Sequence, residues 1–383
     1  MDRIRKFILF RLVYPFFYRL CALRPVKKSK VVFVEVRGKK LDGSFRMIVS
    51  WLNHRRPDMD KKAVFLEWGR CGQIRYLCNC IHMIYEISDA GTVFIAEACN
   101  VLGAVPKRKG TKVIQLWHGC GAFKKFGCST AELRWGAGRK ELEKYPNYGN
   151  MDIITVSSPE VSWAYEEAMG VDSDRIYPVG VSRTDIFFKK AFLEKAAQKL
   201  NQVVPDKGSR KVILYAPTFR GTLENPVSCE EFPWALFARQ FGRDALLLVK
   251  HHPFVKNVPE IPRECRDCVF DVTGEMTIEE LLCVSDLCIS DYSSLIFEYS
   301  LFERPMIFFA PDIEDYQDWR GFYYPYEEMT PGPVCTDAET LMKEISAVFT
   351  GFDRKKVREF RERFMCACDG HATDRIMKLA LDD

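Results

Sequence analysis

The sequence predicts an α/β protein built from two Rossmann-type domains. Short apolar runs of strand length alternate with longer helical stretches, and this alternation occurs in both halves of the 383 residues. A polar stretch over residues 190–211 separates the halves, and the length suits two domains of roughly 150 residues each. We therefore expect two doubly wound parallel sheets that face one another, with a cleft between them at the carboxyl ends of their strands.

The first half of the chain contains five apolar runs that we interpret as buried strands. Enough residues separate them for crossover helices, which favours a parallel sheet. The runs are Lys30–Val36, Ala63–Trp68, Thr92–Glu97, Lys112–Trp117 and Asp152–Ser158.

The second half repeats this pattern. Its expected strands are Lys211–Thr218, Asp244–Pro253, Cys268–Thr273, Asp286–Ser294 and Arg304–Asp312. We expect an N-terminal domain over residues 30–190 and a second domain over residues 205–350. Helices over residues 351–383 are expected to pack back toward the first domain.

Residues 1–29 form a basic amphipathic segment. Residues 1–30 contain nine Lys or Arg and one acid, Asp2, among many apolar side chains. Arg11 and Arg19 interrupt the apolar run well short of the roughly 18 residues that a membrane span needs, and no small-residue cleavage site follows. The segment suits an anionic membrane surface, or a helix packed on the protein's own core. The remaining basic residues are not clustered, so nucleic acid is not an expected partner.

The fifteen cysteines indicate structural thiols rather than a metal site. The one CxxC pair, Cys265 and Cys268, has no partner pair at zinc spacing. No clustered acidic motif is evident either. We expect no disulfides, no protein-bound metal and no cofactor.

The most informative polar cluster follows the fourth strand, where His118 is flanked by glycines. Gly119 and Gly121 allow a sharp turn that brings backbone amides close to a ligand, and Lys124 and Lys125 add positive charge. A lone histidine after a strand can also be structural, so this cluster alone leaves both interpretations open.

Other polar clusters also fall where expected strands end. In "KHHP" we expect one histidine to be a hydrogen-bonding residue at the sheet end, and we favour His252 for the site. Ser293 and Ser294 precede a helix whose free amides favour phosphate, although a simple serine cap is the alternative. Glu298, one turn further, could reach ribose hydroxyls or be a solvated helix charge. Arg183, Pro217, Thr218, His251, Pro253 and Arg320 complete these clusters.

Several enzyme classes lack their sequence fingerprint here. No GxGxxG follows the first strand, and neither GxxxxGK[ST] nor GxSxG occurs. The reaction class that remains is transfer from a nucleotide-activated donor, with a histidine as base.

Four segments together resemble the CDP-glycerol glycerophosphotransferases of wall teichoic acid synthesis. They are "LWHGCGAFKKFG", "YPVGVSRTDIFF", "ILYAPTFRG" and the long run from Thr277 to Val334. The resemblance implies a GT-B-like fold and peripheral association with the cytoplasmic face of the membrane. It also implies transfer of glycerol phosphate from CDP-glycerol to a hydroxyl of a polyprenyl-linked acceptor, with release of CMP.

The resemblance also implies roles for individual residues. His118 matches the proposed catalytic base, and His252 matches a second essential histidine near the pyrophosphate. Glu298 falls where many members have Asp. The segments that match donor-binding regions contain Gly119, Cys120, Gly121, Ala122, Arg183, Pro217, Thr218, His251, Pro253, Ser293 and Ser294.

Three alternatives remain open from the sequence. CDP-ribitol or a nucleotide sugar could replace CDP-glycerol on the same scaffold, and a non-catalytic nucleotide-binding protein is a further possibility. The long extra N-terminal region of polymerising members is missing, so a primase-like enzyme is expected as readily as a polymerase. The oligomeric state stays open.

Overall fold

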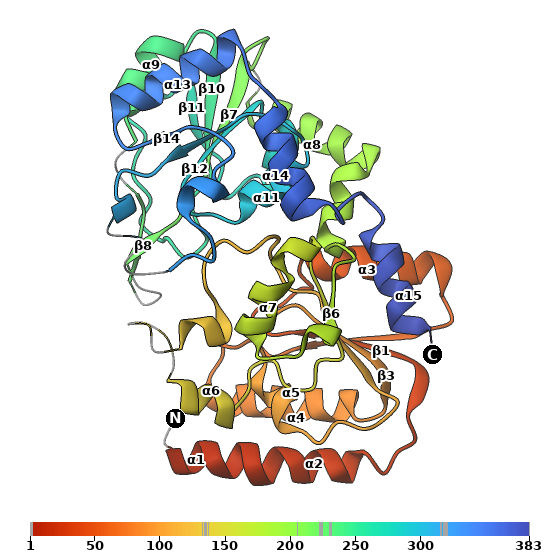
Figure 1. Ribbon diagram of the computed structural model, residues 1–383. Helices are drawn as coiled ribbons and strands as arrows, with labels where there is room; N and C mark the ends of the chain where they lie inside the picture. The colour runs from red at the N-terminus through yellow and green to blue at the C-terminus, as the bar shows by residue number, and fades with distance from the viewer. Residues whose placement is uncertain are drawn as a thin grey trace. The chain divides into compact units, whose positions relative to one another are not determined.

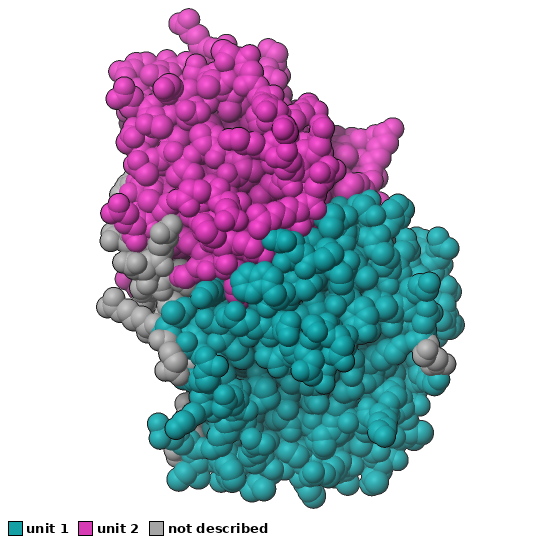
Figure 2. All heavy atoms as spheres, viewed as in Figure 1, with its two compact units in different colours: residues 1–121, 125–186, 366–383 teal, residues 122–124, 187–365 magenta. Residues whose placement is uncertain are grey.

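The computed structural model describes residues 3–131, 133, 136, 138–204, 206–221, 225–229, 232–314, 316 and 321–382 (Figure 1). The chain forms two compact units, coloured separately in Figure 2. Unit 1 comprises residues 1–121, 125–186 and 366–383, and unit 2 comprises residues 122–124 and 187–365. Each unit contains a six-stranded sheet whose paired strands are all parallel, which confirms the predicted α/β class.

The sheet of unit 1 has the strand order β2-β1-β3-β4-β5-β6. The chain moves outward from β1 to β2 and then returns to β3 on the other side of β1. The order therefore reverses between β1 and β3, and ligands of open α/β sheets bind at the carboxyl ends of strands beside such a reversal. The strands are β1 (Lys27–Glu35), β2 (Asp60–Phe65), β3 (Ala90–Ile95), β4 (Lys112–Gln115), β5 (Ile153–Thr155) and β6 (Ile176–Tyr177).

Helices cover both faces of this sheet. The helices α3 (Gly43–Arg55) and α15 (Ala372–Leu381) lie together on one face, and α4 (Gln73–Ile87) and α5 (Asn100–Ala104) lie on the other (Figure 1). Phe45 of α3 and Ile376 of α15 pack with Phe33 and Phe94 of the sheet in one buried apolar cluster. The short helix α6 (Arg139–Lys144) and α7 (Ser162–Met169) complete unit 1.

The N-terminal segment is a helix with two different sides. It consists of α1 (Arg3–Ile8), a π-helical turn (Leu9–Val13) and α2 (Tyr14–Cys21). Phe10, Tyr14 and Tyr18 are buried on the side toward α4 and α5. The side chains of Phe7, Leu12, Phe16 and Leu20 are exposed. Of the residues described, no helix has the length and apolar character that crossing a membrane requires.

The sheet of unit 2 has the order β11-β10-β7-β12-β13-β14, with the reversal between β7 and β12. Its strands are β7 (Lys211–Tyr215), β10 (Ala245–Val249), β11 (Val269–Asp271), β12 (Leu287–Ser290), β13 (Met306–Phe309) and β14 (Val334–Cys335). The helices are α8 (Lys190–Val203), α9 (Trp234–Phe241), α10 (Ile278–Val284), α11 (Leu295–Ser300), α13 (Ala338–Thr350) and α14 (Lys355–Met365). A small antiparallel pair, β8 (Arg220–Gly221) and β9 (Pro226–Val227), follows β7.

The cysteines are free thiols throughout, and most of them are buried. The thiol of Cys268 lies 3.5 Å from the carbonyl oxygen of Cys265, within its own loop. Among the described side chains, no group of three or more His, Cys, Asp or Glu has the arrangement of a metal site.

Candidate active site

His118 stands at the carboxyl end of β4, directly after a strained residue. Trp117 has a φ of 55°, in the left-handed region that non-glycine residues rarely occupy. Its backbone N–H donates to the Gln115 side chain at 3.0 Å, and its carbonyl accepts from the Ser44 hydroxyl at 2.8 Å. These bonds hold a conformation that costs about 1–3 kcal/mol, and strain of this kind concentrates at functional sites.

The imidazole of His118 has a defined proton position. Its Nδ1 atom lies 3.1 Å from the carbonyl oxygen of Ala96, which can only accept, so Nδ1 carries the proton in the neutral ring. The lone pair is therefore on Nε2. Part of the His118 side chain remains accessible to solvent. The surrounding protein atoms nevertheless remove water from the imidazole, and this desolvation is the main cause that lowers its pKa. The Ala96 carbonyl opposes this shift, and the charge of Arg183 adds to it.

The glycine-flanked turn after His118 is held from several sides. Gly121 adopts a φ of 63°, and its N–H donates to the Ser157 hydroxyl at 3.1 Å. The Tyr165 hydroxyl donates to the Gly121 carbonyl at 3.1 Å. Cys120 is buried, and its thiol contacts that of Cys368. Gly119 belongs to the same turn, whereas the buried Ala122 is the first residue of the chain that clusters with unit 2.

Arg183 is brought to His118 from a distant part of unit 1. Its guanidinium donates to the His118 carbonyl oxygen at 2.6 Å. A positive charge thus lies beside the imidazole and disfavours its protonation. Asp185, two residues later, accepts from the backbone amides of Ala372 and Thr373 at 3.1 and 2.7 Å. It therefore caps the N-terminus of α15, which is a structural role.

Sequence reasoning missed a group of acidic residues at the same edge of this sheet. Glu35 ends β1, Glu97 follows β3, and Asp42 begins α3. Burial raises the pKa of Glu97 to about 7, Arg37 opposes this shift at 3.4 Å, and Glu35 adds to it. Burial is also the main cause that raises the pKa of Glu35. Glu35 and Glu97 stand at the ends of the first and third expected strands, and this placement was the available signal.

Asp291 organises the carboxyl edge of the sheet in unit 2, where the strand order reverses between β7 and β12. Its carboxylate accepts from the Thr218 N–H at 2.9 Å and from the Thr218 hydroxyl at 2.8 Å. Arg220 donates to it at 2.9 Å and forms a two-pronged contact with Asp312 at 2.6 and 3.0 Å. The aromatic ring of Tyr292 lies 5.1 Å from this guanidinium. Thr218, a predicted site residue, is therefore held rigidly at the position where ligands of such sheets bind.

The two adjacent histidines of unit 2 have different surroundings. His251 is buried, its Nδ1 lies 3.0 Å from the Ser228 hydroxyl, and burial is the main cause that lowers its pKa. His252 is half-buried, and its ring packs against Phe219 and Phe254 at 4.8 and 4.7 Å. The Phe254 N–H donates to Nδ1 of His252 at 3.2 Å, so the proton of the neutral ring is on Nε2. His252 thus presents an N–H where His118 presents a lone pair.

The remaining predicted site residues also lie on unit 2. Ser294 takes the N-cap position of α11 without a capping bond from its side chain, and Ser293 precedes it. Glu298 is buried, which excludes a solvated helix charge. Pro217 is buried beside Thr218, Pro253 is exposed after His252, and Arg320 lies outside the described residues.

Unit 1 therefore brings together His118, Gly119, Cys120, Gly121 and Arg183. Unit 2 carries Pro217, Thr218, His251, His252, Pro253, Ser293, Ser294 and Glu298. Two Rossmann-type units, each with polar residues at the carboxyl ends of its strands, define the class of GT-B-like α/β enzymes.

The chain belongs to the CDP-glycerol:poly(glycerophosphate) glycerophosphotransferase family, whose family model matches residues 16–382. It is 33% identical over 365 residues to the teichoic acid ribitol-phosphate primase of Bacillus spizizenii, covering 93% of this chain and 92% of that protein. It is 30% identical over 308 residues to the teichoic acid glycerol-phosphate primase of Bacillus subtilis, covering 78% of this chain and 76% of that protein. The protein is thus an enzyme of the family that transfers glycerol phosphate or ribitol phosphate in teichoic acid synthesis.

Two solved structures show the same fold. The wall teichoic acid polymerase TagF superposes with a TM-score of 0.75 at 23% identity, over 96% of this chain and 92% of that one. The UDP-GlcNAc 2-epimerase of Neisseria meningitidis superposes with a TM-score of 0.58 at 12% identity, over 92% of this chain and 100% of that one. Both confirm the predicted GT-B-like arrangement of elements.

Proposed function

We propose that the protein transfers a polyol phosphate from a CDP-polyol to a hydroxyl of a lipid-linked acceptor and releases CMP. His118 is the general base of this reaction. The observation that supports this role is the contact between its Nδ1 and the Ala96 carbonyl, because it leaves the Nε2 lone pair available to take a proton.

The reaction needs this base because an alcohol is a weak nucleophile near neutral pH. As the acceptor oxygen forms its bond to the β-phosphorus of the donor, its proton passes to Nε2 of His118 and the bond to CMP breaks. A positioned base of this kind contributes on the order of 10²- to 10⁴-fold to the rate. The lowered pKa of His118 keeps the imidazole neutral at physiological pH.

Unit 2 binds the CDP part of the donor. His252 offers an Nε2–H, which suits a pyrophosphate oxygen, and the backbone around Thr218 is fixed by Asp291. Ser293 and Ser294 add hydroxyls and amides at the start of α11, and the buried carboxylate of Glu298 suits ribose hydroxyls. These donors would also stabilise the negative charge that develops on CMP. The cationic side chain of Arg183 is a further candidate for binding phosphate.

Two polyols are candidates for the transferred group. The family description names glycerol, as does the resemblance of the segments. The greater extent of similarity to the ribitol-phosphate primase favours ribitol. A competition assay with equal amounts of CDP-glycerol and CDP-ribitol, with UDP-sugars as controls, decides between them: the preferred polyol appears in the product, and transfer of sugar alone would refute the proposal.

We also propose that the enzyme works at the cytoplasmic face of the membrane as a peripheral protein. The support is the N-terminal helix, which exposes Phe7, Leu12, Phe16 and Leu20 next to Arg11 and Arg19. Apolar side chains flanked by cations suit the headgroup region of an anionic bilayer. This location brings the site to an acceptor that is dissolved in the membrane.

A further inference from the structure

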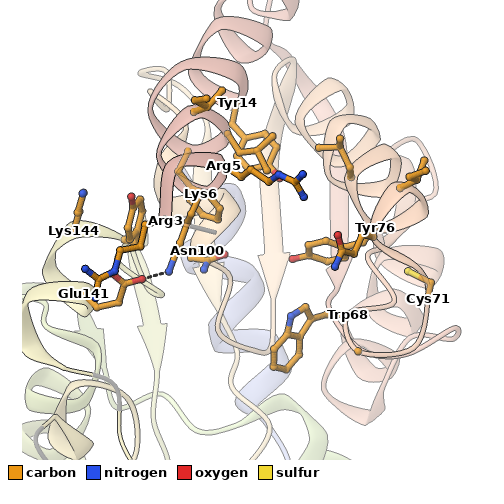
Figure 3. A pocket seen from close by; sticks show the side chains of 18 of the residues that line it. Arg3, Arg5, Lys6, Tyr14, Trp68, Cys71, Tyr76, Asn100, Glu141 and Lys144 are labelled. Atoms are coloured by element: carbon orange, nitrogen blue, oxygen red, sulfur yellow. Dashed lines mark hydrogen bonds and ion pairs between the residues drawn. The ribbon is translucent and has the colours of Figure 1, made fainter. Parts of the chain in front are cut away.

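A large cavity lies in unit 1 beside the N-terminal helix (Figure 3). Its volume is about 1300 Å³, above the roughly 300–1,000 Å³ of ordinary small-molecule pockets. Its walls come from α1 and α2, from the loop after β2 with the first turns of α4, and from α6. We call it the N-terminal cavity.

The walls of the N-terminal cavity are mainly apolar. Tyr14 and Tyr76 line it, and both hydroxyls bond with the thiol of Cys80, so their polar ends are satisfied inside the protein. Trp68 is 49% exposed and Ile74 is 81% exposed at its margin. Large apolar side chains that remain in water beside a cavity indicate a surface that a ligand covers.

Cations surround this apolar space. Arg3, Arg5, Lys140 and Lys144 line it, and in Figure 3 the side chain of Arg5 extends from α1 into the gap toward α4. Lys6 is paired with Glu141, the acidic residue among the lining side chains. The cavity therefore combines apolar walls with an excess of positive charge. An anionic head attached to a long hydrocarbon chain matches both features.

The N-terminal cavity reaches the sheet edge that carries His118. Trp68 follows β2, the edge strand of the sheet, and Asn100 begins α5 after β3, which is the strand next to β4. The guanidinium of Arg37 lies 4.8 Å from the Trp68 ring and 3.4 Å from the carboxylate of Glu97. Glu97 in turn follows Ala96, whose carbonyl contacts His118. This chain of contacts joins the wall of the cavity at Trp68 to the sheet edge that carries the base.

We propose that the N-terminal cavity binds the lipid anchor of the acceptor, a polyprenyl chain with a phosphate head. The chain lies along Tyr14, Tyr76 and Ile74, and the phosphates face Arg3 and Arg5. This inference rests on the proposed function, because the acceptor is lipid-linked only there. The inference goes beyond the proposed function because it names the part of the protein that binds the lipid.

The test is cross-linking of the full-length protein in detergent to a polyprenyl phosphate with a photoreactive diazirine on its chain. Two variants change the cavity, Arg5→Glu in its charge and Ile74→Asp in its apolar margin. Two matched variants make the same changes at exposed positions outside it, Arg19→Glu and Leu23→Asp. All four positions are exposed, so folding is expected to persist, and circular dichroism checks this.

We expect the two cavity variants to reduce cross-linking by about tenfold or more, since charge reversal at a phosphate and a carboxylate in the chain path are both costly. The two control variants should cross-link like the original protein, and the labelled peptides should come from the cavity walls. Unlabelled polyprenyl phosphate should compete, whereas phosphatidylglycerol or inorganic phosphate at the same concentration should not. Equal loss in all four variants, or equal competition by phosphatidylglycerol, would overturn the inference in favour of a general membrane surface.

CMP release by the original protein separates this inference from the proposed function. A protein that releases CMP from a CDP-polyol but is not labelled in the cavity contradicts the lipid site and leaves the function standing. A protein that is labelled there but turns over no donor contradicts the function and leaves the lipid site standing.

Discussion

The Nδ1 atom of His118 lies 3.1 Å from the carbonyl oxygen of Ala96, whereas Nδ1 of His252 accepts a backbone N–H from Phe254 at 3.2 Å. The two neutral rings therefore carry their protons on opposite nitrogens. His118 presents a lone pair through Nε2, and His252 presents a proton through Nε2. In the reaction we propose, this difference favours His118 for proton removal and His252 for phosphate binding.

The rate of transfer should depend on pH through His118. A base must be neutral, and its pKa is lowered below the ordinary histidine value of about 6.5. We therefore expect kcat/KM to fall only as the pH drops below about 6.5. A fall that begins well above pH 7 on the acid side would contradict this assignment.

Arg183→Gln should move that acid limb. The guanidinium beside His118 lowers the pKa of the imidazole, so its removal should raise that pKa and shift the limb to higher pH. Arg183→Lys keeps the charge and serves as the control for the pH shift. An unchanged limb in Arg183→Gln, whatever happens to KM, would show that the charge does not act on His118.

Glu97→Gln should change stability in a pH-dependent way. The folded-state pKa of Glu97 is raised to about 7 by burial, so the folded protein loses stability as the pH rises from the unfolded value near 4.5 toward 7. A neutral glutamine removes this loss. Relative to the original protein, the free energy of unfolding of the variant should therefore rise by up to about 3 kcal/mol between pH 5 and pH 8. Loss of the contact with Arg37 reduces this gain. Urea unfolding of both proteins at pH 5 and pH 8 measures this change. The same difference in free energy of unfolding at the two pH values would contradict the prediction.

Asp291→Asn should destabilise unit 2 strongly. Asp291 is almost fully buried and pairs with Arg220 and Thr218, so the change leaves a buried guanidinium with one fewer anionic partner. We expect a loss of about 3 kcal/mol in the free energy of unfolding, together with weaker CDP binding. Asp312→Asn, which alters the more exposed partner of the same arginine, should cost less. Equal losses in the two variants would argue against Asp291 as the centre of this network.

Membrane association should depend on the exposed side of the N-terminal helix. Leu12→Asp combined with Phe16→Asp should reduce sedimentation with anionic vesicles, because both side chains are exposed and the change opposes burial in the headgroup region. Deleting the whole segment is a poorer test, since Tyr14 and Tyr18 are part of the packed structure. Val258→Asp, at an exposed apolar position of unit 2, is the control. Unchanged sedimentation of the double variant would refute the proposed contact.

The strands could be predicted because their signal is local. All ten apolar runs contain or overlap a strand of the structure, including β4 before His118 and β12 before Ser293. The turn at Gly121 could be predicted from the same stretch of sequence. The positive φ of this residue is the conformation that favours glycine there.

The contacts that give the site residues their chemistry could not be predicted, because they join distant parts of the chain. Arg183 reaches His118 across 65 positions, and Asp291 meets Thr218 across 73. The raised pKa of Glu97 depends on burial beside Glu35, which no spacing in the sequence reveals. The N-terminal helix left two interpretations open for a similar reason: only the fold shows that one side is packed while the other stays exposed.

The most direct test is CMP release by purified original protein and by His118→Ala, with CDP-glycerol or CDP-ribitol and a lipid-linked acceptor. CDP binding is measured on both proteins, and His82→Ala, which removes an exposed histidine of α4, is the control. We expect His118→Ala to bind CDP normally and to release CMP on the order of 10²- to 10⁴-fold more slowly, while His82→Ala is unaffected. Full activity in His118→Ala would contradict the assignment of this histidine as the base.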